Sequence, residues 1–159
     1  MNCYVDIETT GFSPKSDAFT RLTAIRAHGY EIVDIYDQMV NPGRVARPAI
    51  LQMTGLRQEV LDLMPTLNEV REDFRKFIKG AQLIAWSSYE NRWLPHHGLA
   101  AKCFDAIVEV KRVTNKTLPV ADYKLPTICK HFHIPLRHHD SLSDTLAVYH
   151  ICNLTGAYR

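Results

Sequence analysis

The fold and the chemistry of this chain depend on residues 3–11, which read CYVDIETTG. Alternating apolar residues ahead of a Thr-Thr-Gly turn predict a β-strand. Because successive side chains of a strand point to opposite faces, Asp6 and Glu8 should share one face, with roots about 7 Å apart. Neighbouring carboxylates repel each other, and burial penalises both charges further. The stretch therefore predicts a site for one or two hard divalent cations. The alternative is an edge strand with two solvated acids.

The composition is that of an ordinary globular protein. At 159 residues, the chain is long enough for one sizeable core, so we expect a single domain over residues 1–159. Hydrophobic residues make up 46% of the chain and charged residues 23%. The net charge of +2 gives no broad basic surface for nucleic acid. A local basic patch remains compatible with a catalyst that must release its product.

Cysteine usage and hydropathy predict a cytoplasmic protein. The four cysteines are scattered without a CxxC pair, which favours reduced thiols over a zinc site. Asp6 and Glu8 interrupt the only early apolar run, so no signal peptide is expected. No stretch has the length and apolar character of a membrane span, and no membrane partner is expected.

The remaining pattern predicts a mixed sheet flanked by helices. Residues 21–27 and 30–40 should form an antiparallel meander with the first strand. Later strands are expected at 82–85 and 104–108. A capping box of Thr66 and Glu69 should begin a helix that runs to Ile78. Further helical segments are expected at 49–53, 56–64, from Ser87 or Ser88 to Pro95, at 109–113, at 125–132 and from Asp140 or Ser141 onward. This order favours an α/β fold with five strands, an antiparallel meander followed by parallel strands.

Two more acids and one histidine could join Asp6 and Glu8. Glu90 and Asp144 stand near the starts of helices, where the helix dipole alone would favour an acid. His139 stands just before the last helix, so it could reach the same spot as Asp144. A neutral imidazole there would be a competent general base. Five other histidines are expected to be solvated loop residues: His96, His97, His131, His133 and His138.

Five motifs together resemble the DnaQ-like exonucleases of the DEDDh type. They are residues 6–11 (DIETTG), 41–44 (NPGR), 54–56 (TGL), 123–128 (YKLPTI) and 139–144 (HDSLSD). The resemblance covers nearly the whole chain and is greatest to the group of exonuclease X and the bacterial proofreading subunits. A first-strand Asp-x-Glu followed by a terminal His-x-x-x-x-Asp is a specific combination.

The resemblance implies an RNase H-like fold with four acids around two divalent cations, Mg²⁺ or Mn²⁺. By this likeness Asp6, Glu8 and Asp144 match metal ligands, and His139 matches the general base. Glu90 stands at the third acidic position, normally Asp, which makes the chain a DEEDh variant. Such a centre would cut 5′-mononucleotides from a 3′ end.

The second motif departs from the family pattern, because residues 85–91 read AWSSYEN instead of an Ala-His-Asn-type start followed by Phe-Asp. Phe12 would either stack on a base, worth about 1–3 kcal/mol, or cover the sheet edge. Met53 and Trp86 would either wall the same pocket or pack in the core, with the core favoured for Trp86. The residues expected to border the substrate are Thr9, Thr10, Gly11, Phe12, Met53 and Tyr89. Candidate phosphate contacts are Arg92, Lys111, Arg112, Lys116, Lys124 and Arg137.

Three functions fit these observations. The first is a metal-dependent 3′–5′ exonuclease on single-stranded ends, with DNA favoured over RNA because the nearest-looking relatives act on DNA. The second is a catalytically weak or inactive module that binds nucleic acid or docks a partner. The third is an RNase H-like endonuclease, which would not require His139. The sequence names no protein partner.

Overall fold

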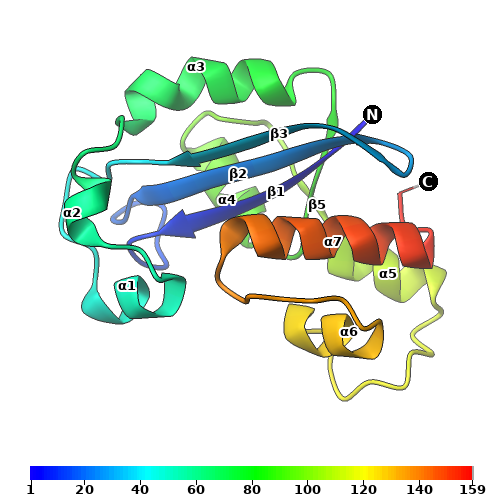
Figure 1. Ribbon diagram of the computed structural model, residues 1–159. Helices are drawn as coiled ribbons and strands as arrows, with labels where there is room; N and C mark the ends of the chain where they lie inside the picture. The colour runs from blue at the N-terminus through cyan, green and yellow to red at the C-terminus, as the bar shows by residue number, and fades with distance from the viewer. Residues whose placement is uncertain (159) are drawn as a thin grey trace.

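The computed structural model describes residues 1–158 and is built on a five-stranded mixed sheet (Figure 1). The sheet order is β3-β2-β1-β4-β5. Its strands are β1 (Asn2–Thr9), β2 (Phe19–His28), β3 (Glu31–Met39), β4 (Gln82–Ala85) and β5 (Phe104–Asp105). The first three strands pair antiparallel, whereas β4 and β5 continue the sheet in parallel. The predicted meander followed by parallel strands is confirmed, and β1 is the central strand.

Helices cover both faces of the sheet (Figure 1). They are α1 (Pro48–Thr54), α2 (Gln58–Leu61), α3 (Leu67–Ile78), α4 (Tyr89–His96), α5 (Ala106–Val113), α6 (Leu125–His131) and α7 (Ser141–Thr155). One core lies between the sheet and helices α3 and α4, and a second lies between the sheet and helices α5, α6 and α7. Among the described residues, no helix combines the length and the apolar character needed to cross a membrane.

The two faces of β1 contribute to different cores. Cys3, Val5 and Ile7 pack in the core beneath α3 and α4. Tyr4 packs in the other core, where its ring meets Tyr149 of α7 edge-on at 5.6 Å between centroids. Continuing along the face of Tyr4, the alternation of the strand brings the acid pair of β1 to the side of α7.

Capping residues fix the starts of two helices. The Glu69 carboxylate accepts a hydrogen bond from the Thr66 backbone at 2.7 Å, which completes the predicted capping box of α3. Asp140 caps α7 by accepting from the backbone N–H of Ser143 at 3.2 Å. Both predicted helix starts are confirmed.

The strand predicted over residues 104–108 is wrong for most of its length. Only Phe104–Asp105 pairs with β4, and the chain is helical from Ala106. Ala106 and Val110 lie one helical turn apart and are both fully buried in the core beside α7. This packing overrides the β-propensity of the local apolar run.

Candidate active site

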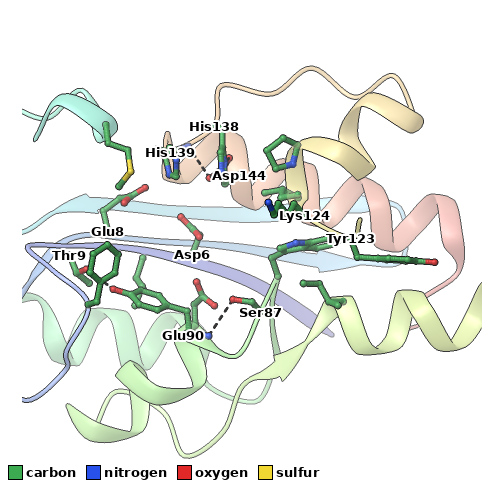
Figure 2. Close-up of a pocket in the computed structure, with 18 of the residues that line it drawn as sticks. Asp6, Glu8, Thr9, Ser87, Glu90, Tyr123, Lys124, His138, His139 and Asp144 are labelled. Carbon is green, nitrogen blue, oxygen red and sulfur yellow. Dashed lines mark hydrogen bonds and ion pairs between the residues drawn. The ribbon is translucent and has the colours of Figure 1, made fainter. Parts of the chain in front are cut away.

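Four carboxylates from three elements point into one cleft of about 790 Å³ (Figure 2). Asp6 and Glu8 come from β1, Glu90 comes from the first turn of α4, and Asp144 comes from the first turn of α7. The structure thus brings together all four acids that the sequence singled out, although they are spread over 139 positions of the chain.

Burial raises the pKa of all four acids, and the charges of neighbouring acids raise those of Asp6, Glu8 and Glu90 further. Burial raises the pKa of Asp6, and the charge of Asp144 raises it further. Burial likewise raises the pKa of Glu8, followed by the charges of Asp6 and Asp144. The pKa of Glu90 is raised well above its ordinary value by burial and then by Asp6. Ionising the whole set at neutral pH therefore requires compensating positive charge.

Glu90 shows that the cleft fits a bound cation. Glu90 is only 5% exposed, and its Oε2 has no hydrogen-bond partner within residues 1–158. A buried carboxylate oxygen without a partner is unusual in a folded protein. Carboxylate donors alone suit hard dications such as Mg²⁺ and Mn²⁺.

His139 lies beside Asp144, as the sequence predicts for a base next to the acids. Its backbone N–H donates to Asp144 Oδ2 at 3.1 Å. Its φ of 69° lies in the left-handed region, which is sparsely populated by residues other than glycine and recurs at functional sites. Burial lowers the pKa of His139, and His138 lowers it further. The charge of Asp144 opposes this shift, and the net effect favours the neutral form of the imidazole.

His138 is a cleft residue that the sequence alone does not indicate. It was expected to be a solvated loop histidine, but its Nδ1 lies 3.1 Å from Asp144 Oδ2 and its ring stacks on His139 with centroids 3.8 Å apart. Its position directly before His139 was the only available signal. His97, also predicted to be solvated, instead stacks on the ring of Trp93, a buried residue of α4.

The expected substrate residues divide into two groups. Thr9, Phe12, Met53 and Tyr89 line the cleft. The Thr9 hydroxyl lies 2.7 Å from the Tyr89 hydroxyl, which donates to the Gly11 carbonyl at 2.9 Å. These contacts fix the turn after β1. Phe12, 65% exposed, and Met53, 41% exposed, present apolar surface beside the acids.

Thr10 and Gly11 do not line the cleft. The Thr10 hydroxyl accepts from the Ala18 backbone N–H at 3.0 Å. A side chain at Gly11 would meet the Asp17 carboxyl group at 2.5 Å. Both residues therefore shape the turn that presents Phe12.

The far end of the cleft is aromatic and basic. Lys111 and Lys124 line it, and the Lys111 ammonium lies 4.9 Å from the centroid of the Tyr123 ring. Trp86, for which the core is favoured, packs against the core between the sheet and helices α5, α6 and α7. It also lines the cleft, and its indole N–H is buried without a partner among the described residues. Arg112, in contrast, is paired with Glu109.

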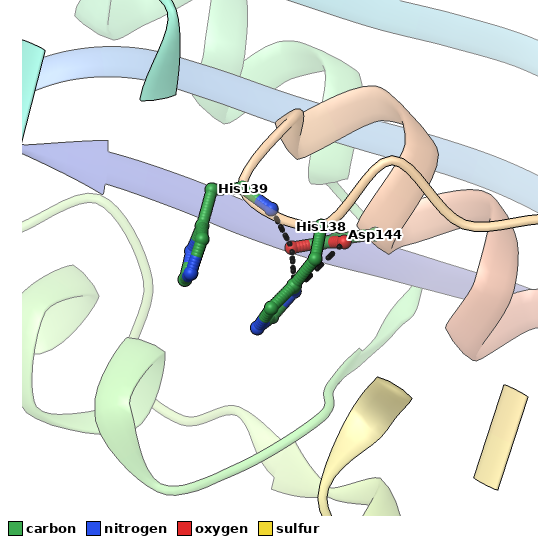
Figure 3. Close-up of side chains that lie close together, drawn as sticks. All are labelled: His138, His139 and Asp144. Atoms are coloured by element: carbon green, nitrogen blue, oxygen red, sulfur yellow. Dashed lines mark hydrogen bonds and ion pairs between the residues drawn. The ribbon is translucent and has the colours of Figure 1, made fainter. Parts of the chain in front are cut away.

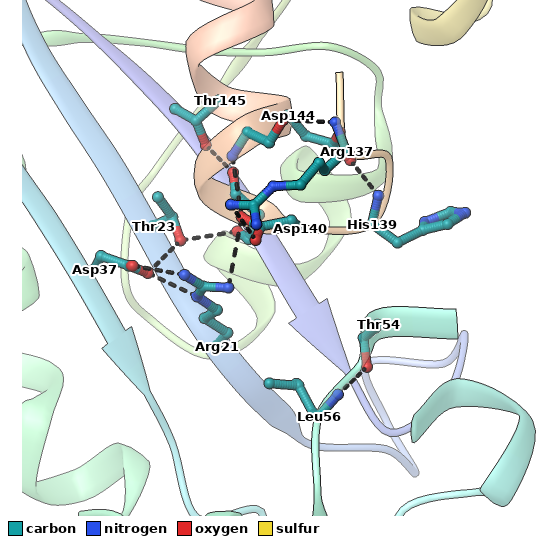
Figure 4. Close-up of polar contacts among 12 residues, drawn as sticks. Arg21, Thr23, Asp37, Thr54, Leu56, Arg137, His139, Asp140, Asp144 and Thr145 are labelled. Atoms are coloured by element: carbon teal, nitrogen blue, oxygen red, sulfur yellow. Dashed lines mark hydrogen bonds and ion pairs between the residues drawn. The ribbon is translucent and has the colours of Figure 1, made fainter. Parts of the chain in front are cut away.

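A polar network outside the cleft ties the start of α7 to the sheet (Figure 4). Arg21 donates two hydrogen bonds to Asp37, at 2.7 and 2.6 Å, and lies 3.8 Å from Asp140. Thr23 also donates to Asp37, at 2.9 Å, and accepts from Ser141 at 2.8 Å. The first turn of α7, which carries Asp144 and follows His139 directly, is thereby fixed relative to the sheet.

The sheet order and the acids of the central strand define an RNase H-like nuclease fold. A family model described as Exonuclease, the RNase T family, matches residues 4–152. The chain therefore belongs to this exonuclease family, and the predicted family is confirmed. Exonucleases of the DEDDh type depend on divalent metal ions.

Solved structures share the fold at low sequence identity. The nuclease domain of 3′hExo, a DEDDh family member bound to rAMP, superimposes with a TM-score of 0.79 at 18% identity, covering 96% of this chain and 89% of that one. The zinc-bound form of the E. coli ExoI–ssDNA complex gives a TM-score of 0.81 at 12% identity, covering 96% of this chain and 39% of that one. These likenesses support the fold.

Relatives by sequence are PolC-type DNA polymerases III. The Bacillus subtilis (strain 168) protein is 28% identical over 158 residues, which cover 92% of this chain and 11% of that protein. The Clostridium perfringens (strain 13 / Type A) protein is 30% identical over 155 residues, which cover 92% of this chain and 10% of that protein. The chain spans about a tenth of the length of these curated relatives.

Proposed function

We propose that this domain is a metal-dependent 3′–5′ exonuclease that releases 5′-mononucleotides from single-stranded 3′ ends. The observation that carries the proposal is the convergence of four acids and His139 on one cleft of an exonuclease fold. A docking module without catalysis would have no reason to hold four mutually repelling carboxylates together.

The ligands for two divalent cations, Mg²⁺ or Mn²⁺, would be Asp6, Glu8, Glu90 and Asp144. When bound, such a pair polarises the phosphodiester and stabilises both the attacking and the leaving oxygen. Glu90 has one methylene more than the usual Asp, and its residue still lines the cleft from the first turn of α4.

His139 would accept the proton of the attacking water at a ring nitrogen. Its pKa is lowered by burial, so the imidazole is free to take up a proton at neutral pH. The hydrogen bond from its backbone to Asp144 keeps the base beside the acids.

The terminal nucleotide would lie between Phe12 and Met53, the exposed apolar side chains next to the acids. Lys111 and Lys124, at the other end of the cleft, would contact phosphates of the incoming strand. DNA is the favoured substrate, because the ExoI structure is an ssDNA complex and the sequence relatives are DNA polymerases. We place the activity in the cytoplasm, since all four cysteines are free and buried.

Digestion of a 5′-labelled oligonucleotide tests this function. Single-stranded DNA and the matched RNA are incubated with Mg²⁺ or Mn²⁺, and product lengths are followed over time. We expect stepwise shortening with release of mononucleotides, faster on DNA, and no cleavage by Asp6→Ala. Asp73→Ala removes an exposed acid of α3 and should cut like the parent. Internal fragments would indicate an endonuclease, and full activity of Asp6→Ala would refute the assignment.

A further inference from the structure

His138 adds a second imidazole to one side of the acidic cleft. Its Nδ1 lies 3.1 and 3.3 Å from the two carboxylate oxygens of Asp144. Figure 3 shows both histidine rings extending from the loop before α7 on the same side of that carboxylate. The proposed exonuclease reaction uses His139 and Asp144 but assigns no role to His138.

The three side chains have the spacing of a metal-binding group. One ligand atom each from His138, His139 and Asp144 lies within 4.8 Å of the others. Zinc ligands at about 2.0–2.2 Å from a tetrahedral ion are roughly 3.4 Å apart. Closing the group around an ion therefore needs side-chain movement of roughly an ångström. The His138 side chain is 41% exposed, so solvent leaves room for this movement, in which its contact with Asp144 would give way to the ion.

The donor atoms differ from those of the other three acids. Asp6, Glu8 and Glu90 offer oxygen alone, which suits Mg²⁺ and Mn²⁺. Two imidazoles and a carboxylate favour a borderline ion such as Zn²⁺, which also exceeds Mn²⁺ in general affinity for such sites. The cleft therefore holds two adjoining donor sets of different preference.

We propose that His138, His139 and Asp144 form an inhibitory binding site for Zn²⁺. An ion held there occupies the imidazole that would accept the proton and the carboxylate that would hold a catalytic cation. Phosphodiester cleavage should then stop while zinc is bound. The binding site stands on the geometry alone, and its inhibitory effect rests on the proposed exonuclease function.

Calorimetric titration of Zn²⁺ in excess Mg²⁺, without nucleic acid, tests the binding site. We expect one Zn²⁺ per chain and at least about tenfold weaker binding by His138→Ala, since even outer-shell substitutions weaken metal sites about 10–100-fold. His150→Ala removes an exposed histidine of α7 and should bind like the parent. Co²⁺ gives a second readout, because its visible absorption reports imidazole coordination and should change in intensity and position in His138→Ala, which keeps one imidazole. Melting curves check that each variant is folded.

Failure of this inference can be distinguished from failure of the proposed function. If zinc binds equally well to the parent and to His138→Ala, or does not bind, the site is refuted even when the protein cuts DNA with Mg²⁺. If zinc binds through His138 but Mg²⁺ supports no cleavage, the exonuclease proposal fails and the binding site stands. In an active enzyme, His138→Ala should raise the Zn²⁺ concentration for half-inhibition at least about tenfold. An unchanged value would refute the inhibitory role.

Discussion

The Ser141 hydroxyl donates a hydrogen bond to the Thr23 hydroxyl at 2.8 Å, joining residues 118 positions apart in the chain. Both residues are fully buried, and they attach the first turn of α7 to β2. Thr23 is also the partner of Asp6 in the β1–β2 register. This buried contact therefore links the helix that carries Asp144 to the strand that pairs with Asp6, on opposite sides of the acidic group.

Thr23→Val should weaken this attachment without changing the side-chain volume. It removes both hydrogen bonds of the Thr23 hydroxyl, the one accepted from Ser141 and the one donated to Asp37. We expect the free energy of unfolding to fall by about 1–3 kcal/mol and nuclease activity to fall as well. Urea denaturation and oligonucleotide digestion measure the two effects. Thr117→Val, at an exposed position away from the cleft, should change neither.

His139→Ala should remove the proposed proton acceptor and leave the fold intact. Loss of a general base typically slows a reaction about 10²–10⁴-fold. The measurement is single-turnover release of mononucleotide at saturating Mg²⁺. The pH–rate profile should also lose its acidic limb, which a merely structural defect would not produce. A rate within twofold of the parent would assign the base elsewhere.

Divalent cations should stabilise the native protein. Because a ligand that binds only the folded state adds about 2.7 kcal/mol at 100 times its Kd, Mn²⁺ should raise the Tm measurably. Asp6→Asn should abolish most of this increase while raising the Tm of the metal-free protein, since it relieves repulsion by Glu8 and Asp144. A catalytically dead docking module would show no Mn²⁺-dependent stabilisation.

The metal-free protein should lose stability as the pH rises. The pKa values of Asp6, Glu8 and Glu90 are raised in the folded state. Between the ordinary carboxyl pKa of about 4 and neutral pH, the folded state therefore binds more protons than the unfolded chain, so the free energy of unfolding falls with pH. Glu90→Gln removes one of these titrations and should make the slope shallower, by up to about 1.4 kcal/mol per pH unit. Denaturation in EDTA from about pH 5 to pH 7.5 measures it; an unchanged slope would contradict the prediction.

Phe12→Ala should weaken substrate binding more than it slows chemistry. Loss of a base stack of about 1–3 kcal/mol corresponds to roughly 5–150-fold in KM. Steady-state kinetics on a short single-stranded DNA separate KM from kcat. Leu63→Ala truncates another exposed apolar side chain, away from the cleft, and should leave both unchanged. Equal effects of the two substitutions would mean that Phe12 only covers the sheet edge.

Features encoded locally could be predicted from the sequence. Strand alternation places Asp6 and Glu8 on one face, and the caps at Thr66 and Asp140 fix two helix starts. The end of β5 could not be predicted, because burial of Ala106 against α7 decides it.

The contact of His138 with Asp144 could not be predicted from the sequence either. Its Asp144 contact depends on how the loop approaches the first turn of α7, and no periodic pattern encodes that path. Nor does residue type distinguish Thr9, which lines the cleft, from Thr10, which turns toward Ala18.

The cleft joins parts of the molecule with very different resistance to local opening. Its acidic floor belongs to β1, which pairs with β2 along its whole length between two cores. The wall that carries Met53 is α1, whose single buried residue is Ile50. Backbone amides beneath the acids should therefore exchange with deuterium only on global unfolding, while those of α1 exchange through small fluctuations. A cleft with a rigid floor and a pliable wall would admit ligands of different width without moving the carboxylates.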